Sequence, residues 1–149
     1  MSVSFKHQLG QLLHDTPEYH HLHGSLEFKI NQAVVPYMGY FGVSDVCLNI
    51  WLAELSKLIL AYRQGEDTYT IDECEQGQPA FQFDFQDGVG YLSIVESITE
   101  AEGDKDWQRI EFKMADLVAA YNQLKTAFLS DIAHTAPHRV VYWQQILEA

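Results

Sequence analysis

Basic residues are scarce in this chain, which has nine Lys and Arg against 21 Asp and Glu and a formal net charge of −12. Proteins that bind nucleic acids through phosphates need a basic surface, and so does electrostatic attraction to an anionic lipid surface. The sequence therefore predicts neither nucleic-acid binding nor membrane binding. A basic protein is the kind of partner that this charge balance favours.

Cysteines and long apolar runs are also few. The two cysteines, Cys47 and Cys74, form no CxxC motif, so we expect no disulfide scaffold and two reduced thiols, as in a cytoplasmic protein. No run approaches the roughly 18 consecutive apolar residues that predict a membrane-spanning helix. The first residues lack a basic segment followed by an apolar one, so no signal peptide is expected.

Apolar residues as a class are plentiful, at 47% of the chain with 13% aromatic, which favours a folded globule over disorder. A length of 149 residues is typical of one domain. No internal repeat, low-complexity tract or linker divides the sequence. We therefore expect a single domain over residues 1–149.

Apolar residues at helical spacing predict four helices. The first is short, over residues 4–14, and rests on Phe5, Leu9, Leu12 and Leu13. The clearest covers residues 45–64, and it is apolar beyond a single stripe, so we expect it to be buried on more than one side. Its expected end signals are Ser44 as N-cap, Asp45 in the first turn and Gly65 after the last turn. Two more helices are predicted over residues 115–133 and, after Pro137, over residues 138–148.

Elsewhere the apolar period changes to two, which predicts strands over residues 25–31, 68–73, 80–86, 89–98 and 107–114. The cleanest alternation is "AFQFDFQ", in which three phenylalanines are expected to face the core and Asp84 to face outward. The dipeptide Asp87-Gly88 fits a two-residue hairpin turn that pairs Gln86 with Val89, Asp84 with Tyr91 and Gln82 with Ser93. The predicted fold class is α+β, an antiparallel β-meander of four or five strands packed against the long central helix and the C-terminal helices.

The acidic residues are concentrated in one part of the chain. Residues 66–106 contain twelve Asp and Glu and one basic residue, Lys105, so almost all the net charge lies on the meander and its turns. Such a surface can serve solubility alone, or it can dock a basic partner and speed the association. Aromatic side chains commonly anchor such interfaces. The candidate partner-binding residues are Asp72, Glu73, Glu75, Asp84, Asp87, Tyr91, Glu96, Glu100, Glu102, Asp104, Asp106 and Trp107.

A histidine-rich segment offers a different chemistry. Residues 14–23 read "HDTPEYHHLH", and histidines with carboxylates can bind zinc. The spacing matches no standard metal site, so the simpler interpretation is a surface loop without a cofactor. The alternative is a metal-binding protein or small hydrolase, with candidate ligands His20, His21 and His23.

Signatures of other catalytic sites are missing. The sequence has no GxSxG motif, and neither cysteine has a histidine nearby in sequence. Cys47 falls inside the long predicted helix, which favours a core residue, while the acidic neighbours of Cys74 disfavour its thiolate. The glycines of "DGVG" lack a phosphate-binding pattern. We therefore expect a protein that acts by binding and not an enzyme.

The order of the predicted elements resembles a known group of proteins. The helix ending in "AYRQG", the strands of "CEQGQPAFQFDFQDGVGYLSIVES" and the strand-to-helix step "WQRIEFKMADLVAAYNQL" are similar in layout to small acidic bacterial immunity proteins of contact-dependent inhibition and other polymorphic toxin systems. The resemblance covers roughly residues 44–129 and rests on that layout and on Trp51, Phe81, Phe83, Trp107, Asp116 and Leu117.

That resemblance implies a cytoplasmic protein that binds and neutralises a cognate toxin effector domain, such as a nuclease with a basic surface. The acidic residues would then be contact residues and not catalysts. The resemblance leaves the oligomeric state open, and neither the histidine-rich segment nor the C-terminal "HRVVYWQQILEA" has a counterpart in it.

Overall fold

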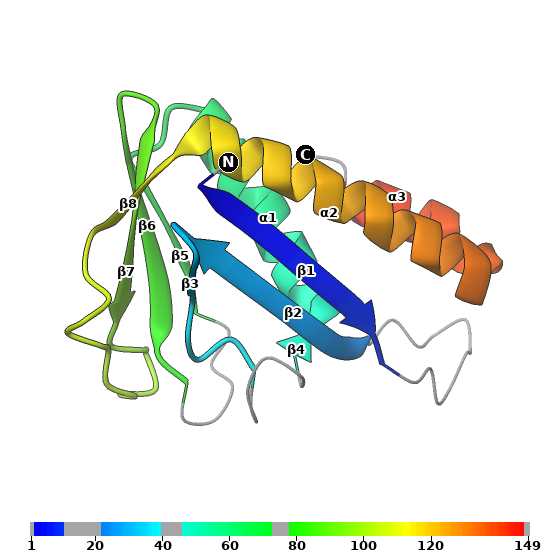
Figure 1. The fold of residues 1–149 in the computed structure, drawn as a ribbon, viewed down its shortest axis with the longest axis horizontal. Coiled ribbons are helices and arrows are strands. Elements are labelled where there is room, and N and C mark those ends of the chain that lie inside the picture. Colours follow the sequence, from blue (N-terminus) through cyan, green and yellow to red (C-terminus); the bar gives the residue numbers. More distant parts are fainter. Residues whose placement is uncertain (1, 11–21, 40–45, 73–77, 148–149) are drawn as a thin grey trace.

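The computed structural model describes residues 2–10, 22–39, 46–72 and 78–147, and within them it contains two four-stranded sheets with three α-helices (Figure 1). Every strand pairing in both sheets is antiparallel. The predicted α+β class is therefore confirmed. The predicted meander forms one sheet, and a second sheet is built around the strand predicted at residues 25–31.

The second sheet comes from the N-terminal part of the chain. Strand β1 (Val3–Leu9) pairs along its whole length with β2 (His23–Ile30). The opposite edge of β2 pairs with two short strands, β3 (Ala33–Val34) and β4 (Val46–Cys47). Asn31 and Gln32, both with positive φ, form the two-residue turn between β2 and β3.

The predicted helix over residues 4–14 is wrong, because residues 3–9 form β1 and residues 11–14 lie outside the described residues. Phe5 packs against Phe28 of β2 with ring centroids 4.7 Å apart, and the His7 side chain is only 8% exposed. His7 thus occupies an inward position where an apolar residue was expected, which hid the period of two. The spacing of Leu12 and Leu13 then favoured a helix.

Helix α1 (Leu48–Arg63) starts later than predicted, because Val46 and Cys47 are used as strand β4. Its first turn contains no acidic residue, and both Ser44 and Asp45 lie outside the described residues. Its end is as predicted. Gly65 has a φ of 82°, and the N–H groups of Gly65 and Glu66 donate to carbonyls of the last turn, which is the usual glycine C-terminal motif.

The predicted meander consists of β5 (Thr68–Ile71), β6 (Ala80–Gln86), β7 (Val89–Val95) and β8 (Ile110–Lys113), paired in that order. The predicted hairpin register is confirmed, with Gln86 opposite Val89 and Asp84 opposite Tyr91. Both residues of the Asp87-Gly88 turn have positive φ. The three phenylalanines of β6 are buried as predicted.

Helix α2 (Met114–Thr135) runs alongside β1, and the short helices η1 (Pro137–Arg139) and α3 (Val140–Ile146) follow it (Figure 1). The backbone N–H and hydroxyl of Ser2 both donate to the carboxylate of Asp116, at 3.0 and 2.8 Å. These hydrogen bonds lower the pKa of Asp116. Near the other end of α2, His7 Nε2 lies 2.8 Å from Asp131. Polar contacts therefore attach both ends of β1 to α2.

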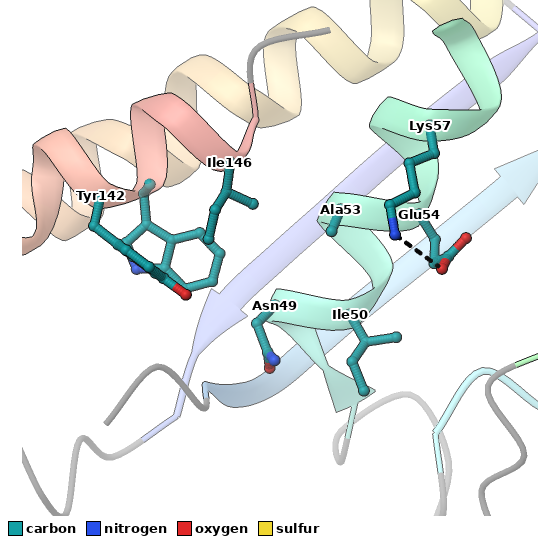
Figure 2. Close-up of a pocket in the computed structure, with 8 residues that line it drawn as sticks. Asn49, Ile50, Ala53, Glu54, Lys57, Tyr142 and Ile146 are labelled. Carbon is teal, nitrogen blue, oxygen red and sulfur yellow. Dashed lines mark ion pairs between the residues drawn. The ribbon is translucent and has the colours of Figure 1, made fainter. Parts of the chain in front are cut away.

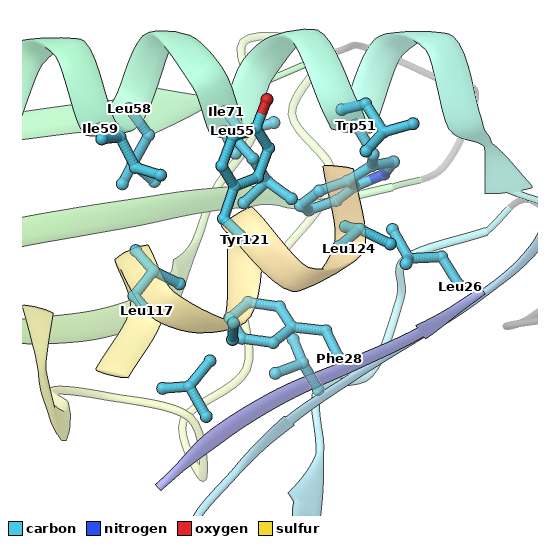
Figure 3. Close-up of a cluster of buried hydrophobic side chains, with 14 of the residues drawn as sticks. Leu26, Phe28, Trp51, Leu55, Leu58, Ile59, Ile71, Leu117, Tyr121 and Leu124 are labelled. Carbon is cyan, nitrogen blue, oxygen red and sulfur yellow. The ribbon is translucent and has the colours of Figure 1, made fainter. Parts of the chain in front are cut away.

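The core joins the two sheets through the helices. Leu117, Tyr121 and Leu124 of α2 lie between α1 and strand β2, where Leu26 and Phe28 face them (Figure 3). Burial raises the pKa of the Tyr121 hydroxyl. Helix α1 therefore has α2 and β2 on one side of it.

The other side of α1 packs on the meander sheet. The ring of Trp51 meets Phe81 edge to face at 5.0 Å, and Tyr62 meets Phe85 at 5.5 Å. The expectation that this helix is buried on more than one side is confirmed. The opposite face of the meander carries its polar side chains.

A glycine in β2 permits the close approach of β1. A Cβ atom at Gly24 would lie 2.2 Å from the carbonyl oxygen of Gln8 and 2.8 Å from Cδ1 of Leu48. We expect Gly24→Ala to lower the free energy of unfolding by about 2 kcal/mol or more, because backbone must move to admit the methyl group. Urea unfolding followed by circular dichroism measures this change.

The matched control is Ser25→Ala, one residue along on the opposite face of β2, for which we expect a change within about 0.5 kcal/mol. Equal stability of the Gly24→Ala variant and the Ser25→Ala variant would show that the backbone contact at Gly24 is not limiting.

Candidate functional site

A group of four exposed carboxylates lies on the segment after β7, residues 96–106, which we name the acidic loop. Its backbone folds back onto the strand, because the Asp104 N–H donates to the Ile94 carbonyl and the Ile94 N–H donates to the Trp107 carbonyl, at 3.0 and 2.8 Å. A tight turn within the loop is closed by the Ser97 N–H and the Ala101 carbonyl at 2.9 Å. The exposed acidic residues on it are Glu96, Glu100, Glu102 and Asp106.

Asp72, which follows β5, holds the acidic loop through hydrogen bonds to its carboxylate. Its two carboxylate oxygens accept hydrogen bonds from the Ser97 hydroxyl at 2.7 Å and from the Ile98 N–H at 2.8 Å. A charged acceptor makes such bonds stronger than neutral ones. Asp72, predicted as a contact residue, therefore has a structural role in holding the loop.

Asp104 has a similar role at the other end of the loop. It accepts hydrogen bonds from the Asp106 N–H at 2.9 Å and from the Tyr37 hydroxyl at 3.0 Å. The hydrogen bond and the negative charge of Asp104 raise the pKa of Tyr37. Tyr37, which is 47% exposed, therefore belongs to this surface, although it was not among the predicted contact residues.

Ile98 is the apolar exception on the acidic loop. Its side chain is 81% exposed, and its neighbours in sequence include Glu96 and Glu100. Ile98 was predicted to end a strand over residues 89–98, but β7 ends at Val95. The end of the strand could have been predicted from the abrupt rise in acidic residues after Val95, because acidic residues are more typical of a loop than of a strand.

A second acidic group lies at the opposite end of the meander, beside the β6–β7 turn. Asp87 lines a shallow cavity of about 290 Å³ together with Glu66 and Asp67. The length of β7, roughly 20 Å for seven residues, separates this group from the acidic loop. The exposed acidic residues among the predicted contacts thus divide between two ends of one sheet, while Asp84 and Tyr91 lie between them.

The outer face between these two ends is balanced in charge. Asp84, Tyr91 and Glu111 lie in one row across three strands. The Arg109 guanidinium stacks over the Tyr91 ring, 4.2 Å from its centroid, and Lys113 lies opposite Val89 on the same face. Two acidic and two basic side chains share this face, so its charge contributes little to the net −12.

The remaining predicted residues of this region are already engaged within the protein. Gln82 donates to both carboxylate oxygens of Asp84. Trp107 is half-buried and packs against the core. Ser93, which was expected on the outer face, is only 4% exposed, and its hydroxyl accepts a hydrogen bond from the Arg109 N–H at 3.0 Å. Of the predicted candidates, the exposed residues therefore remain the most available to a partner, and these are Asp87, Glu96, Glu100, Glu102 and Asp106.

The other predicted acidic residues and most of the histidine-rich segment cannot be placed, since Glu73, Glu75, His20 and His21 lie outside the described residues. His23 lies at the start of β2, where its Nε2 is 3.4 Å from Sγ of Cys47. In the described parts of the chain, no three His, Cys, Asp or Glu residues gather in an arrangement that could hold a metal ion.

Cys47 differs from its predicted place. It precedes α1 as its N-cap and pairs within β4, instead of lying inside the helix, but it is buried as expected. No histidine lies near Cys47 in the sequence, since His23 is 24 residues away. The β2–β4 pairing, in which His23 and Cys47 are opposite each other, brings the two side chains together.

A groove of about 270 Å³ separates α1 from α3, with Asn49, Ile50 and Ala53 on one side and Tyr142 and Ile146 on the other (Figure 2). The two charged side chains that line the groove form an ion pair with each other. Lys57 pairs with Glu54 at 3.8 Å, and Glu54 also accepts a hydrogen bond from Tyr69. The groove therefore offers little unpaired charge to a ligand.

Comparison with protein-family models, with curated proteins and with solved structures found no match for this chain. Within the described ranges, no helix is both long enough and apolar enough to cross a membrane.

The support that Asp72 gives to the acidic loop can be measured by amide hydrogen exchange. We expect Asp72→Ala to speed exchange of the Ile98 N–H by about tenfold or more, because a hydrogen bond to a charged acceptor is lost. The control Glu96→Ala removes the same charge nearby without removing that bond. Unchanged exchange at Ile98 in Asp72→Ala would contradict the proposed support.

The contact between Tyr37 and the acidic loop can be followed through the titration of the phenol. We expect Asp104→Asn to lower the pKa of Tyr37 toward the ordinary tyrosine value, because Asp104 supplies the main causes that raise it. Asp106→Asn, which removes the smallest contribution, should have a smaller effect. NMR titration, with the Tyr37 ring assigned through Tyr37→Phe, gives both values, and equal effects would argue against the contact.

Proposed function

We propose that this protein acts by binding a basic protein and neutralising it, in the manner of an immunity protein against a toxin effector domain. The observation that carries the proposal is the acidic loop, on which four carboxylates are exposed while Asp72 and Asp104 hold the backbone in place. A surface of this kind attracts a basic partner and selects against an acidic one.

The acidic loop supports this function better than the outer face of the meander does. On the outer face, Arg109 and Lys113 offset Asp84 and Glu111, so attraction to a basic partner is weak there. On the loop, Lys105 is the only base among residues 96–106. The excess negative charge is therefore concentrated where the side chains are most exposed.

The hydrogen bonds of the loop favour tight binding for a further reason. A loop that is already held in one shape loses less conformational entropy when it binds than one that must first be ordered. The exposed glutamates can then occupy the positions that phosphate groups take on a nucleic-acid-binding surface. In this proposal the protein blocks the partner by occupying that surface, and it catalyses no reaction.

The proposal is tested by capturing partners from a lysate of the source organism with three forms of the tagged protein. One is unmodified, one carries Glu96→Gln, Glu100→Gln and Glu102→Gln, and the matched control carries Glu66→Gln, Asp67→Asn and Asp87→Asn. Both variants lose three negative charges. The first loses them from the acidic loop, and the control loses them from the opposite end of the meander. Quantitative mass spectrometry identifies and measures what is retained.

We expect the unmodified protein and the control to retain the same basic protein, and the loop variant to retain about tenfold less, since three exposed charges contribute about 0.5 kcal/mol each. Retention should also fall at about 0.5 M salt, where the screening length is near 4 Å. Equal loss in both variants, or retention that is insensitive to salt, would contradict a docking role for the acidic loop.

A further inference from the structure

The contact between Cys47 and His23 lies apart from the acidic loop and plays no role in the function proposed above. The two residues are opposite each other in the β2–β4 pairing, and Sγ lies 3.4 Å from Nε2. This separation is within hydrogen-bonding distance for a thiol and an imidazole nitrogen. In proteins, a nucleophilic side chain is commonly activated by a general base within hydrogen-bonding distance of it.

The end of helix α1 adds to this arrangement. Cys47 is the N-cap residue of α1, and its side chain makes no capping hydrogen bond to the helix. The sulfur is turned toward His23 instead. The N-terminus of a helix carries partial positive charge, and reactive thiols in proteins are commonly found beside a helix N-terminus or a histidine. Two independent features therefore act on the same sulfur atom.

Backbone hydrogen bonds hold both residues in place. The Gly10 N–H donates to the His23 carbonyl at 2.9 Å, and the Leu48 N–H donates to the Leu22 carbonyl at 2.8 Å. The first of these bonds joins the backbone of His23 to the residue that follows β1, and the second joins the start of α1 to the residue that precedes β2. The thiol–imidazole distance thus depends on sheet pairing and not on a mobile side chain alone.

We propose that Cys47 is a nucleophilic thiol activated by His23 and that it reacts with small, uncharged, soft electrophiles such as hydroperoxides. Cys47 is only 6% exposed, whereas His23 is exposed. The imidazole can therefore exchange protons with solvent while the sulfur admits only small reagents. This burial distinguishes the site from that of an enzyme acting on a macromolecular substrate.

The reaction with a hydroperoxide balances within these two residues. Nε2 of His23 takes the thiol proton, and the thiolate sulfur attacks one peroxide oxygen. The S–O bond forms as the O–O bond breaks, and the leaving oxygen takes the proton back from His23 and departs as water or an alcohol. The sulfur is oxidised by two electrons to a sulfenic acid, and the peroxide is reduced by two electrons.

The test begins with Cys74→Ser, so that Cys47 is the only cysteine of the chain. Iodoacetamide is the first probe, and the mass of the Cys47 peptide gives the alkylation rate at about pH 6.5 and pH 8.5. An ordinary thiol is about 1% ionised at the lower pH. His23→Gln removes the base, and the control His134→Gln alters an exposed histidine whose ring contacts only its own helix in the hydrogen bonds described, at the Ser130 carbonyl.

We expect His23→Gln to slow alkylation of Cys47 by about tenfold at the lower pH and by much less at the higher pH, because the base matters most when few thiols are ionised. His134→Gln should leave both rates unchanged. Equal rates at the lower pH with and without His23 would overturn the proposal. Circular dichroism on each variant confirms that the fold is retained.

Two further outcomes would also overturn the proposal. Alkylation that proceeds at the rate of global unfolding, measured in parallel by urea dependence, would show an inert buried thiol. Alkylation that becomes faster when EDTA is added would show that the thiol is a metal ligand. In a second arm, hydrogen peroxide replaces iodoacetamide and dimedone traps the sulfenic acid, and a dimedone adduct at Cys47 that does not depend on His23 would likewise count against it.

Discussion

The structure depends on one constraint, which is that helix α1 is apolar on more than one side. Trp51 packs on Phe81 of the meander sheet, while Leu55 faces Tyr121 of α2 on another side (Figure 3). Helix α2 in turn packs along β1. Because burial of apolar surface is the main driving force of folding, α1 sets the positions of both sheets. The outer face of the meander and the acidic loop are left facing solvent as a result.

The carboxylates of this protein serve two different purposes. Asp72, Asp104 and Asp116 accept hydrogen bonds from distant parts of the chain, so they connect elements that are far apart in sequence. The exposed glutamates of the acidic loop make no comparable contribution to the fold. Their mutual repulsion costs a few tenths of a kcal/mol per adjacent pair, which the hydrogen bonds of the loop offset. This division is what makes the loop, and not the whole acidic segment, the candidate docking surface.

The elements that were predicted correctly are those that local patterns specify. The strand over residues 80–86, its hairpin turn and the glycine after α1 follow from alternation and from positive φ at Asp87, Gly88 and Gly65. The N-terminal segment was predicted wrongly because its strand is stabilised by pairing with β2, about twenty residues later in the chain. The short strand β4 was missed because it too is stabilised by pairing with β2. In addition, two residues are too few to show an apolar period.

By itself, the sequence determined the α+β class, the register of the central hairpin and the segregation of negative charge into residues 66–106. Only the tertiary structure decided which acidic residues are exposed and that two groups of them lie at opposite ends of one sheet. It also decided that Tyr37 contacts Asp104 and that His23 contacts Cys47. The physical reason is the range of the interactions. Local periodicity and turn geometry act over a few residues, whereas these side chains meet through strand pairing and loop packing across 24 and 67 residues of chain.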